Sequence, residues 1–155
     1  TSRAPGMRFL TPRGLAGLGW GLPMAMGAKL AKPEAPVVCV TGDGGFGHCW
    51  AELEAAKRME LSFTVIVLNN RILGYQMHAE NVKFGTHTDA VYLSDVDHAA
   101  IARACGCRGL RVEELEHLAE ALNEAFQEAG PVVLDVITDP LAYPPITVFE
   151  GKVIC

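Results

Sequence analysis

Short apolar runs, separated by helical patterns, constrain the fold of this chain more than any other feature. The segments 37–41, 63–68 and 132–137 are apolar almost throughout and rich in β-branched residues. A continuous apolar run of this length is typical of a strand buried on both faces, as in a parallel sheet. A weaker run at 108–112 predicts one more strand.

Between these runs the pattern is helical, and we expect helices over 22–31, 50–59, 97–106 and 113–129. Pro23 suits a first helical turn, and Asp97 can cap the third helix. The last helix carries on one face the apolar residues Leu115, Leu118, Leu122 and Phe126. The stretch 71–94 has no regular pattern, and the proline-rich tail after Asp139 is expected to be loop.

Alternating strands and helices predict an α/β fold with a parallel sheet, helices on both faces and right-handed crossovers. The 155 residues suit a single domain spanning 1–155. A net charge of −5 argues against nucleic acid, and no apolar stretch is long enough to span a bilayer.

The chain has five cysteines, and no secretory signal is recognisable at its start. Cys39 and Cys49 stand in apolar segments and are expected to be core residues. The pair Cys105 and Cys107 has no second pair with which to form a metal site. These features favour a reduced protein of the cytoplasm.

A glycine-rich turn, Gly42 to Gly47, follows the first strand and matches the G-x-G-x-x-G pattern of dinucleotide-binding folds. Two observations weigh against that reading. Asp43 would place a carboxylate beside a pyrophosphate, which is costly without a cation between them. The next strand also ends in Asn69-Asn70, where a dinucleotide site needs an acid for the ribose.

A magnesium ion at Asp43 explains the same residues better. Magnesium takes six oxygen ligands and commonly combines one or two protein ligands with phosphates and water. Asp43 offers a carboxylate, Asn70 an amide oxygen, and a nearby main-chain carbonyl a third oxygen. Gly44 and Gly45 lack Cβ atoms, so their N–H groups can approach phosphates closely.

These motifs resemble those of thiamine-diphosphate enzymes. Gly42-Asp43-Gly44, followed 27 residues after Asp43 by Asn70, is similar to the metal-binding motif of that family. The segments Gly14–Pro23 and Asn69–Gly74 resemble the acetolactate synthase branch, and the likeness covers about residues 8–145. The resemblance implies the diphosphate-binding fold of the family, with this chain as the C-terminal part of a longer protein.

The resemblance also implies roles for individual residues. Magnesium would be bound by Asp43, Asn70 and the carbonyl of Ile72. The diphosphate would accept from N–H groups of Gly44, Gly45, Leu73 and Gly74. Leu18 would support the bent cofactor, and the carbonyl of Ala16, where the family usually has glycine, would accept from its amino group.

Each of these residues also has a purely structural interpretation. Leu18 could be plain core, the Asn pair could form only a turn, and Asp43 could cap the following helix. The histidines His48, His87, His98 and His117 are expected to be surface or hydrogen-bonded residues. Residues 75–78 follow the cofactor loop and could face a substrate, but their role stays open.

The resemblance implies a magnesium- and thiamine-diphosphate-dependent transferase or lyase that decarboxylates 2-oxo acids and joins the product to an acceptor. The alternatives are simple 2-oxo acid decarboxylation and a non-catalytic nucleotide-binding module. Ala79 stands near where acetolactate synthases carry a tryptophan, which leaves the substrate open. The activating glutamate is expected on a separate pyrimidine-binding domain, of the same chain or a partner in a homodimer or homotetramer. This chain alone would therefore carry no catalytic residue.

Overall fold

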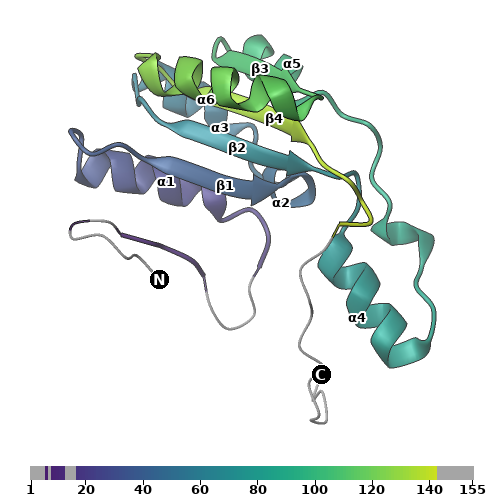
Figure 1. Cartoon of the computed structure of the whole chain (residues 1–155). Helices are drawn as coiled ribbons and strands as arrows, with labels where there is room; N and C mark the ends of the chain where they lie inside the picture. Colours follow the sequence, from purple (N-terminus) through teal and green to yellow (C-terminus); the bar gives the residue numbers. More distant parts are fainter. Residues whose placement is uncertain (1–5, 7, 13–16, 143–155) are drawn as a thin grey trace.

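Four parallel strands form one sheet in the order β1-β2-β4-β3 (Figure 1). The computed structural model describes residues 6, 8–12 and 17–142. The strands are β1 (Val38–Gly42), β2 (Thr64–Asn69), β3 (Arg108–Val112) and β4 (Val132–Ile137). All four predicted strands are confirmed, and so are their parallel pairings.

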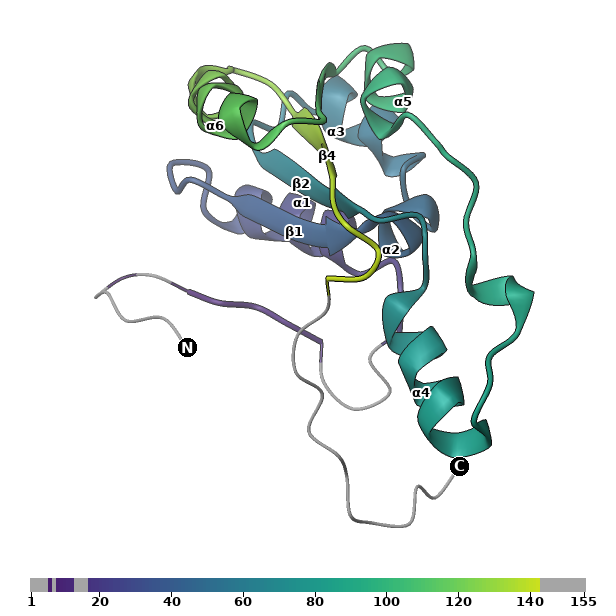
Figure 2. The ribbon, with the colours of Figure 1, turned by 45° about the vertical axis from the view of Figure 1, so that its right-hand side comes forward.

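Helices lie on both faces of this sheet, as predicted (Figures 1 and 2). The helices of the described residues are α1 (Gly21–Ala31), α2 (Asp43–Gly47), α3 (Glu52–Arg58), α4 (Gly74–Phe84), α5 (His98–Ala104) and α6 (Leu118–Gln127), with short 3-10 turns η1 (Asp89–Val91) and η2 (Leu115–His117). All of these helices except α4 pack against the sheet. The carboxylate of Asp97 accepts from the N–H of Ala100 at 2.7 Å, which confirms the predicted cap of α5.

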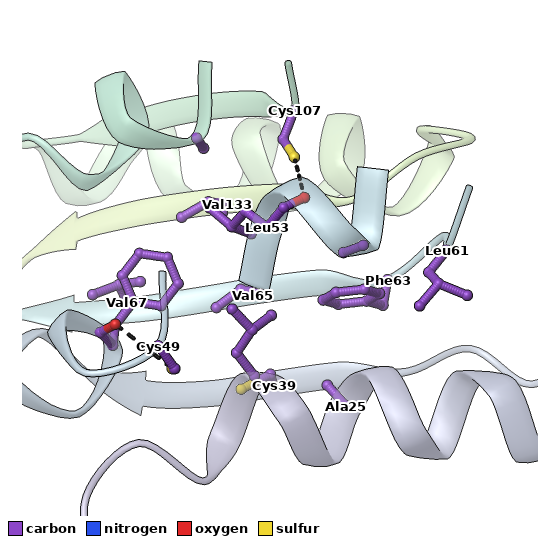
Figure 3. Packing of buried hydrophobic residues seen from close by; sticks show 14 residues of the cluster. Ala25, Cys39, Cys49, Leu53, Leu61, Phe63, Val65, Val67, Cys107 and Val133 are labelled. Atoms are coloured by element: carbon purple, nitrogen blue, oxygen red, sulfur yellow. Dashed lines mark hydrogen bonds between the residues drawn. The ribbon is translucent and has the colours of Figure 1, made fainter. Parts of the chain in front are cut away.

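Two apolar clusters pack on the two faces of the sheet. On one face, residues of α1, α2, α3 and α5 surround the middle of β1, β2 and β4 (Figure 3). Cys39 and Cys49 belong to this cluster, as expected, and the Cys107 thiol donates to the Leu53 carbonyl at 3.6 Å (Figure 3). On the other face, α6 packs against β4 and its neighbours.

The prediction that every strand is buried on both faces is wrong for β1. The side chains of Val38 and Val40 are 47% and 61% exposed, and Leu68 of β2 is exposed beside them. The cause is the position of α6, which covers β3 and β4 and leaves the β1 side of that face open among the described residues. Only the α1 side of β1 is buried.

Three helices differ from expectation, and the first is α2, which occupies most of the segment 42–47 that was predicted to be a turn. The stretch 71–94 contains α4, which has no buried residue and stands away from the sheet (Figures 1 and 2). A helix without a buried face needs no apolar periodicity, so the sequence pattern does not reveal it. The helix expected at 113–129 begins only at Leu118, and Leu115 and Phe126 are exposed rather than packed.

Within the described part of the chain, no helix combines the length and apolar character needed to cross a membrane.

Candidate cofactor site

The parallel pairing of β1 with β2 places the predicted metal ligands together. Gly42 and Leu68 are partners in the register, so the residues that follow each strand lie at the same edge of the sheet. Asp43, only 5% exposed, begins α2 at this edge. Its Oδ2 accepts from the N–H of Arg71 at 2.6 Å, and its Oδ1 accepts from the N–H of Gly44 at 2.8 Å. The carboxylate therefore joins the two loops directly, and Gly42, not Asp43, is the N-cap of α2.

The loop after β2 has a fixed backbone. Arg71 adopts φ 61°, a left-handed conformation that is uncommon for a residue with a side chain. Asn70 Oδ1 accepts from the N–H of Ile72 at 3.2 Å, as in the predicted turn. The N–H of Leu73 donates to the Val91 carbonyl, and the N–H of Leu93 donates to the Arg71 carbonyl, both at 2.8 Å.

Glycines in α2 allow the helix to pack closely against this loop and against β1. A Cβ on Gly44 would lie 2.5 Å from Cδ2 of Leu73, and one on Gly45 would lie 3.0 Å from Oγ1 of Thr41. Gly74 begins α4 immediately beyond the loop. The first residues of α2 and α4 thus lie at one edge of the sheet, and backbone N–H groups at helix starts suit an anion. Of the N–H groups expected to bind the diphosphate, those of Gly44 and Leu73 already donate to Asp43 Oδ1 and to the Val91 carbonyl in this structure.

Leu18 is 55% exposed, so the interpretation of this residue as plain core is wrong. Its neighbour Gly19 has φ 87°, and a Cβ there would lie 3.0 Å from Cβ of His48, just after α2. The turn that carries Leu18 is therefore held against the α2 region. Ala16 lies outside the described residues.

The donor set fits a magnesium ion shared with a diphosphate. Within the described ranges, no three His, Cys, Asp or Glu residues gather as metal ligands. Asp43 is the carboxylate at this edge, and two of the roughly four acceptor positions of a carboxylate are used by N–H groups. Asn70 and the Ile72 carbonyl would add two neutral oxygens, and magnesium commonly takes the remainder from phosphate and water.

His98 differs from its expected surface or hydrogen-bonded role. It is 3% exposed, and its Nδ1 is buried without a hydrogen-bond partner. Burial lowers the pKa of His98 more than the nearby carboxylates of Asp135, Asp43 and Asp97 raise it. The ring packs against Phe46 at 5.4 Å between centroids, so His98 is a neutral core residue at neutral pH. His48 and His117 are exposed, and His87 bonds to Asn81 and Tyr92, as expected.

A pocket of about 210 Å³ opens beside the site, between α2 and the segment 93–98. It includes Asp43 and Gly44 but not Asn70 or Leu73. No cysteine of the described residues lines this pocket, and burial raises the pKa of the Cys39 thiol to about 11, as expected for a core residue.

Two buried polar residues under the site, Asn69 and Asp135, were not among the predicted site residues. Asp135 is the acid within the apolar run 132–137, and a charged residue in such a run is a signal that could have revealed it.

Comparisons with known proteins show the family of this chain. Residues 1–136 match the family model described as the thiamine pyrophosphate enzyme, C-terminal TPP binding domain. The chain belongs to this family. The nucleotide-binding alternative does not fit this result, because the matched domain binds thiamine pyrophosphate.

Several relatives extend the likeness. The chain is 40% identical to YdaP of Bacillus subtilis, named as thiamine pyrophosphate-containing, over 83% of this chain and 22% of the relative. It is 38% identical to acetolactate synthase of Bacillus subtilis, over 86% of this chain and 23% of that enzyme. It is 34% identical to the large subunit of acetolactate synthase isozyme 2 of Escherichia coli, over 86% of this chain and 24% of that subunit.

Among solved structures, a thiamine diphosphate-dependent 4-hydroxybenzoylformate decarboxylase of Rhodococcus jostii matches with a TM-score of 0.77 and 29% identity. The match covers 81% of this chain and 24% of that one. The chain therefore spans about a quarter of the length of the relatives it matches. It is an acetolactate synthase-like domain with the α/β fold of the family.

Proposed function

We propose that this chain holds thiamine diphosphate through magnesium for the decarboxylation of 2-oxo acids and transfer of the product to an acceptor, as in acetolactate synthase. The observation that carries the proposal is the contact between Asp43 Oδ2 and the N–H of Arg71, 2.6 Å long. This contact joins the Asp43 carboxylate to the loop that holds Asn70 and Ile72, at one edge of the sheet. The relatives named as acetolactate synthases support the reaction class.

In this proposal, each residue of the site acts on the position of the cofactor. Asp43, Asn70 and the carbonyl of Ile72 bind the metal, and backbone N–H groups at the starts of α2 and α4 bind the diphosphate. Leu18, exposed on its turn, would support the thiamine portion from below. Thiamine diphosphate, once bound, supplies the carbon nucleophile and the electron sink that decarboxylation requires.

The remaining parts of the active site would come from elsewhere in a longer protein. A pyrimidine-binding domain with an activating glutamate, from the same chain or a partner subunit, would cover the other end of the cofactor. We propose a homodimer or homotetramer in the cytoplasm, and the free thiols of the described cysteines fit that reducing compartment. Without such a domain, the residues described here position the cofactor but do not activate it.

Simple decarboxylation of a 2-oxo acid is the second candidate. The structural similarity to a 4-hydroxybenzoylformate decarboxylase favours it. The two reactions differ in whether an acceptor takes up the product, and residues 75–78, at the start of α4, are candidates for that choice.

Calorimetry on the full-length protein tests the cofactor assignment. We expect binding of thiamine diphosphate that requires Mg²⁺, and no binding of NAD. Asp43→Ala should weaken cofactor binding by more than about 100-fold, because it removes the charged ligand, and Asn70→Ala by about 10-fold.

Asp89→Ala is the matched control, because it removes an exposed carboxylate from η1, outside the proposed ligand set. Its cofactor affinity should equal that of the wild type. If Asp43→Ala binds the cofactor as tightly as Asp89→Ala does, the metal assignment is wrong.

A further inference from the structure

A carboxylate lies fully buried beneath the proposed site, in the middle of β4. Asp135 has 0% exposure and is flanked in its strand by valine, leucine and isoleucine. Burying a carboxylate costs several kcal/mol unless charges and hydrogen bonds compensate, and apolar replacements of buried ion pairs are often neutral or stabilising. Stability alone therefore gives little reason for an acid at this position.

The partners of Asp135 suggest another role, because its three donors come from three different parts of the chain. Its Oδ1 accepts from Nδ2 of Asn69 at 2.9 Å, at the end of β2. Its Oδ2 accepts from the backbone N–H of His98 at 3.0 Å and from Nη1 of Arg111 at 3.1 Å. One buried side chain thus joins the end of β2, the start of α5 and β3.

Asn69 is held in a single orientation by these contacts. Its Nδ2 also donates to the Val96 carbonyl at 3.2 Å, so both amide hydrogens meet oxygen acceptors. A flipped amide would place its oxygen against two oxygens, which excludes that orientation. The backbone carbonyl of Asn69 accepts from the N–H of Thr138 at 2.9 Å. Asn69 is therefore fixed at both side chain and main chain immediately before Asn70.

The loop that follows needs such support. Arg71 has a left-handed backbone, and a strained conformation persists only where its surroundings determine it. The N–H of this same residue donates to Asp43, the charged ligand of the proposed metal. A shift at Asn69 would thus move both side-chain ligands, Asn70 directly and Asp43 through Arg71.

A second, outer connection links Asp135 to Arg71. Arg111 also donates to Asp95 at 3.4 Å, and Asp95 pairs with Arg71 at 3.6 Å. Asp95 is 56% exposed, so these two ion pairs are individually weak. They add a smaller constraint to the same loop.

We propose that Asp135 is a positioning residue for the loop 70–73: through Asn69, its carboxylate fixes the loop in the conformation that presents Asn70, Ile72 and Asp43 to the metal. The proposal rests on the proposed cofactor function. It assigns Asp135 no contact with the metal or the cofactor.

Asp135→Asn in the full-length protein tests the role, because it keeps the size of the side chain but turns an NH₂ group toward at least one of the three donors. The first measurement is amide hydrogen exchange of residues 70–73 without metal or cofactor. We expect exchange about 10-fold faster than in the wild type. The second is Mn²⁺ binding in the presence of thiamine diphosphate, followed by electron paramagnetic resonance. We expect affinity at least about 10-fold weaker, the usual effect of losing an outer-shell partner.

Val133→Ala is the matched control. Val133 is fully buried on the same strand and the same face, within the apolar cluster. Its loss should lower the unfolding temperature while exchange of residues 70–73 and Mn²⁺ affinity stay within about twofold of the wild type. Equal weakening in Val133→Ala would overturn the proposal, because loss of stability would then explain both variants.

The proposal would also be overturned if Asp135→Asn showed the same exchange of residues 70–73 and the same Mn²⁺ affinity as the wild type. If that variant does not fold, Asn69→Ala replaces it, because it removes the amide through which Asp135 acts on the loop. Loop exchange and Mn²⁺ affinity should then change by about 10-fold, and wild-type values of both in Asn69→Ala would reject the proposal. A wild-type protein that binds no Mn²⁺ with thiamine diphosphate would refute the proposed function. The exchange measurement, which needs no ligand, would still decide the role of Asp135.

Discussion

At the scale of single residues, two proposed cofactor contacts have exposures that are unusual for their residue types. Leu18 lies on a turn of glycines and is 55% exposed, although a leucine at that position could have been core. Asp43 shows the opposite behaviour, because it is a charged side chain that is almost fully buried. An exposed apolar residue and a buried acid are both exceptions to the usual distribution of residues, and both fit the roles proposed for them in a cofactor site.

Leu18→Ala should lower turnover more than affinity. Because Leu18 is exposed, its truncation should leave the fold and the diphosphate contacts intact while relaxing the bent cofactor. In the full-length protein we expect steady-state turnover to fall about 10-fold or more, with cofactor affinity within about threefold of wild type. Leu30→Ala, which truncates a leucine of similar exposure near the other end of α1, should change neither quantity. Lost binding with normal turnover would show that Leu18 is only structural.

At the scale of elements, a glycine determines how closely α5 packs on β3. A Cβ on Gly109 would lie 2.1 Å from the carbonyl oxygen of Ala99, a backbone atom that cannot move alone. The close packing places the start of α5 over β4, where the N–H of His98 reaches Asp135. The packing of one helix therefore contributes to the polar network under the site.

Gly109→Ala should displace α5 and destabilise the protein by about 3 kcal/mol, at the upper end of ordinary overpacking. In thermal unfolding followed by circular dichroism, the midpoint should fall by about 6–12 °C. Gly27→Ala is the control, since this glycine lies inside α1 with nothing within 4 Å of the added Cβ. The free energy of unfolding of that variant should rise by about 0.5–1 kcal/mol. Equal midpoints for the two variants would show that α5 accommodates the methyl group.

At the scale of the whole molecule, the described residues leave apolar side chains exposed on two surfaces that bear on partners. One is the face of β1 and β2 formed by Val38, Val40 and Leu68, and the other is α4, with Tyr75 and Phe84 exposed. Parallel sheets are normally covered on both faces, and the chain spans only about a quarter of its relatives. These surfaces are suitable places for the proposed additional domain and partner subunit.

The purified 155-residue chain should therefore be catalytically silent. We expect weak, magnesium-dependent binding of thiamine diphosphate, no release of carbon dioxide from pyruvate, and self-association visible by light scattering. A full-length protein that supplies the proposed activating glutamate should release carbon dioxide under the same conditions. Steady release by the chain alone would contradict this expectation and require a catalytic group among its own residues.

The sequence by itself determined the strands, most of the helices and the motif residues of the candidate site. Apolar runs and helical periodicity are local properties, so 63–68 and 132–137 identified β2 and β4 directly. The spacing from Asp43 to Asn70 depends only on chain order, so the sequence alone could predict both residues as site candidates. The helix α4 was not predicted, because a helix without a buried face shows no apolar periodicity in the sequence.

Only the tertiary structure decided which strands are neighbours and what each buried group meets. The order β1-β2-β4-β3 places Asp43 against Arg71, leaves one face of β1 open, and brings Asn69 and Arg111 to Asp135. These contacts join residues that lie 24 to 66 positions apart. No local pattern encodes such pairs, because they depend on how helices of different length and position pack on the sheet.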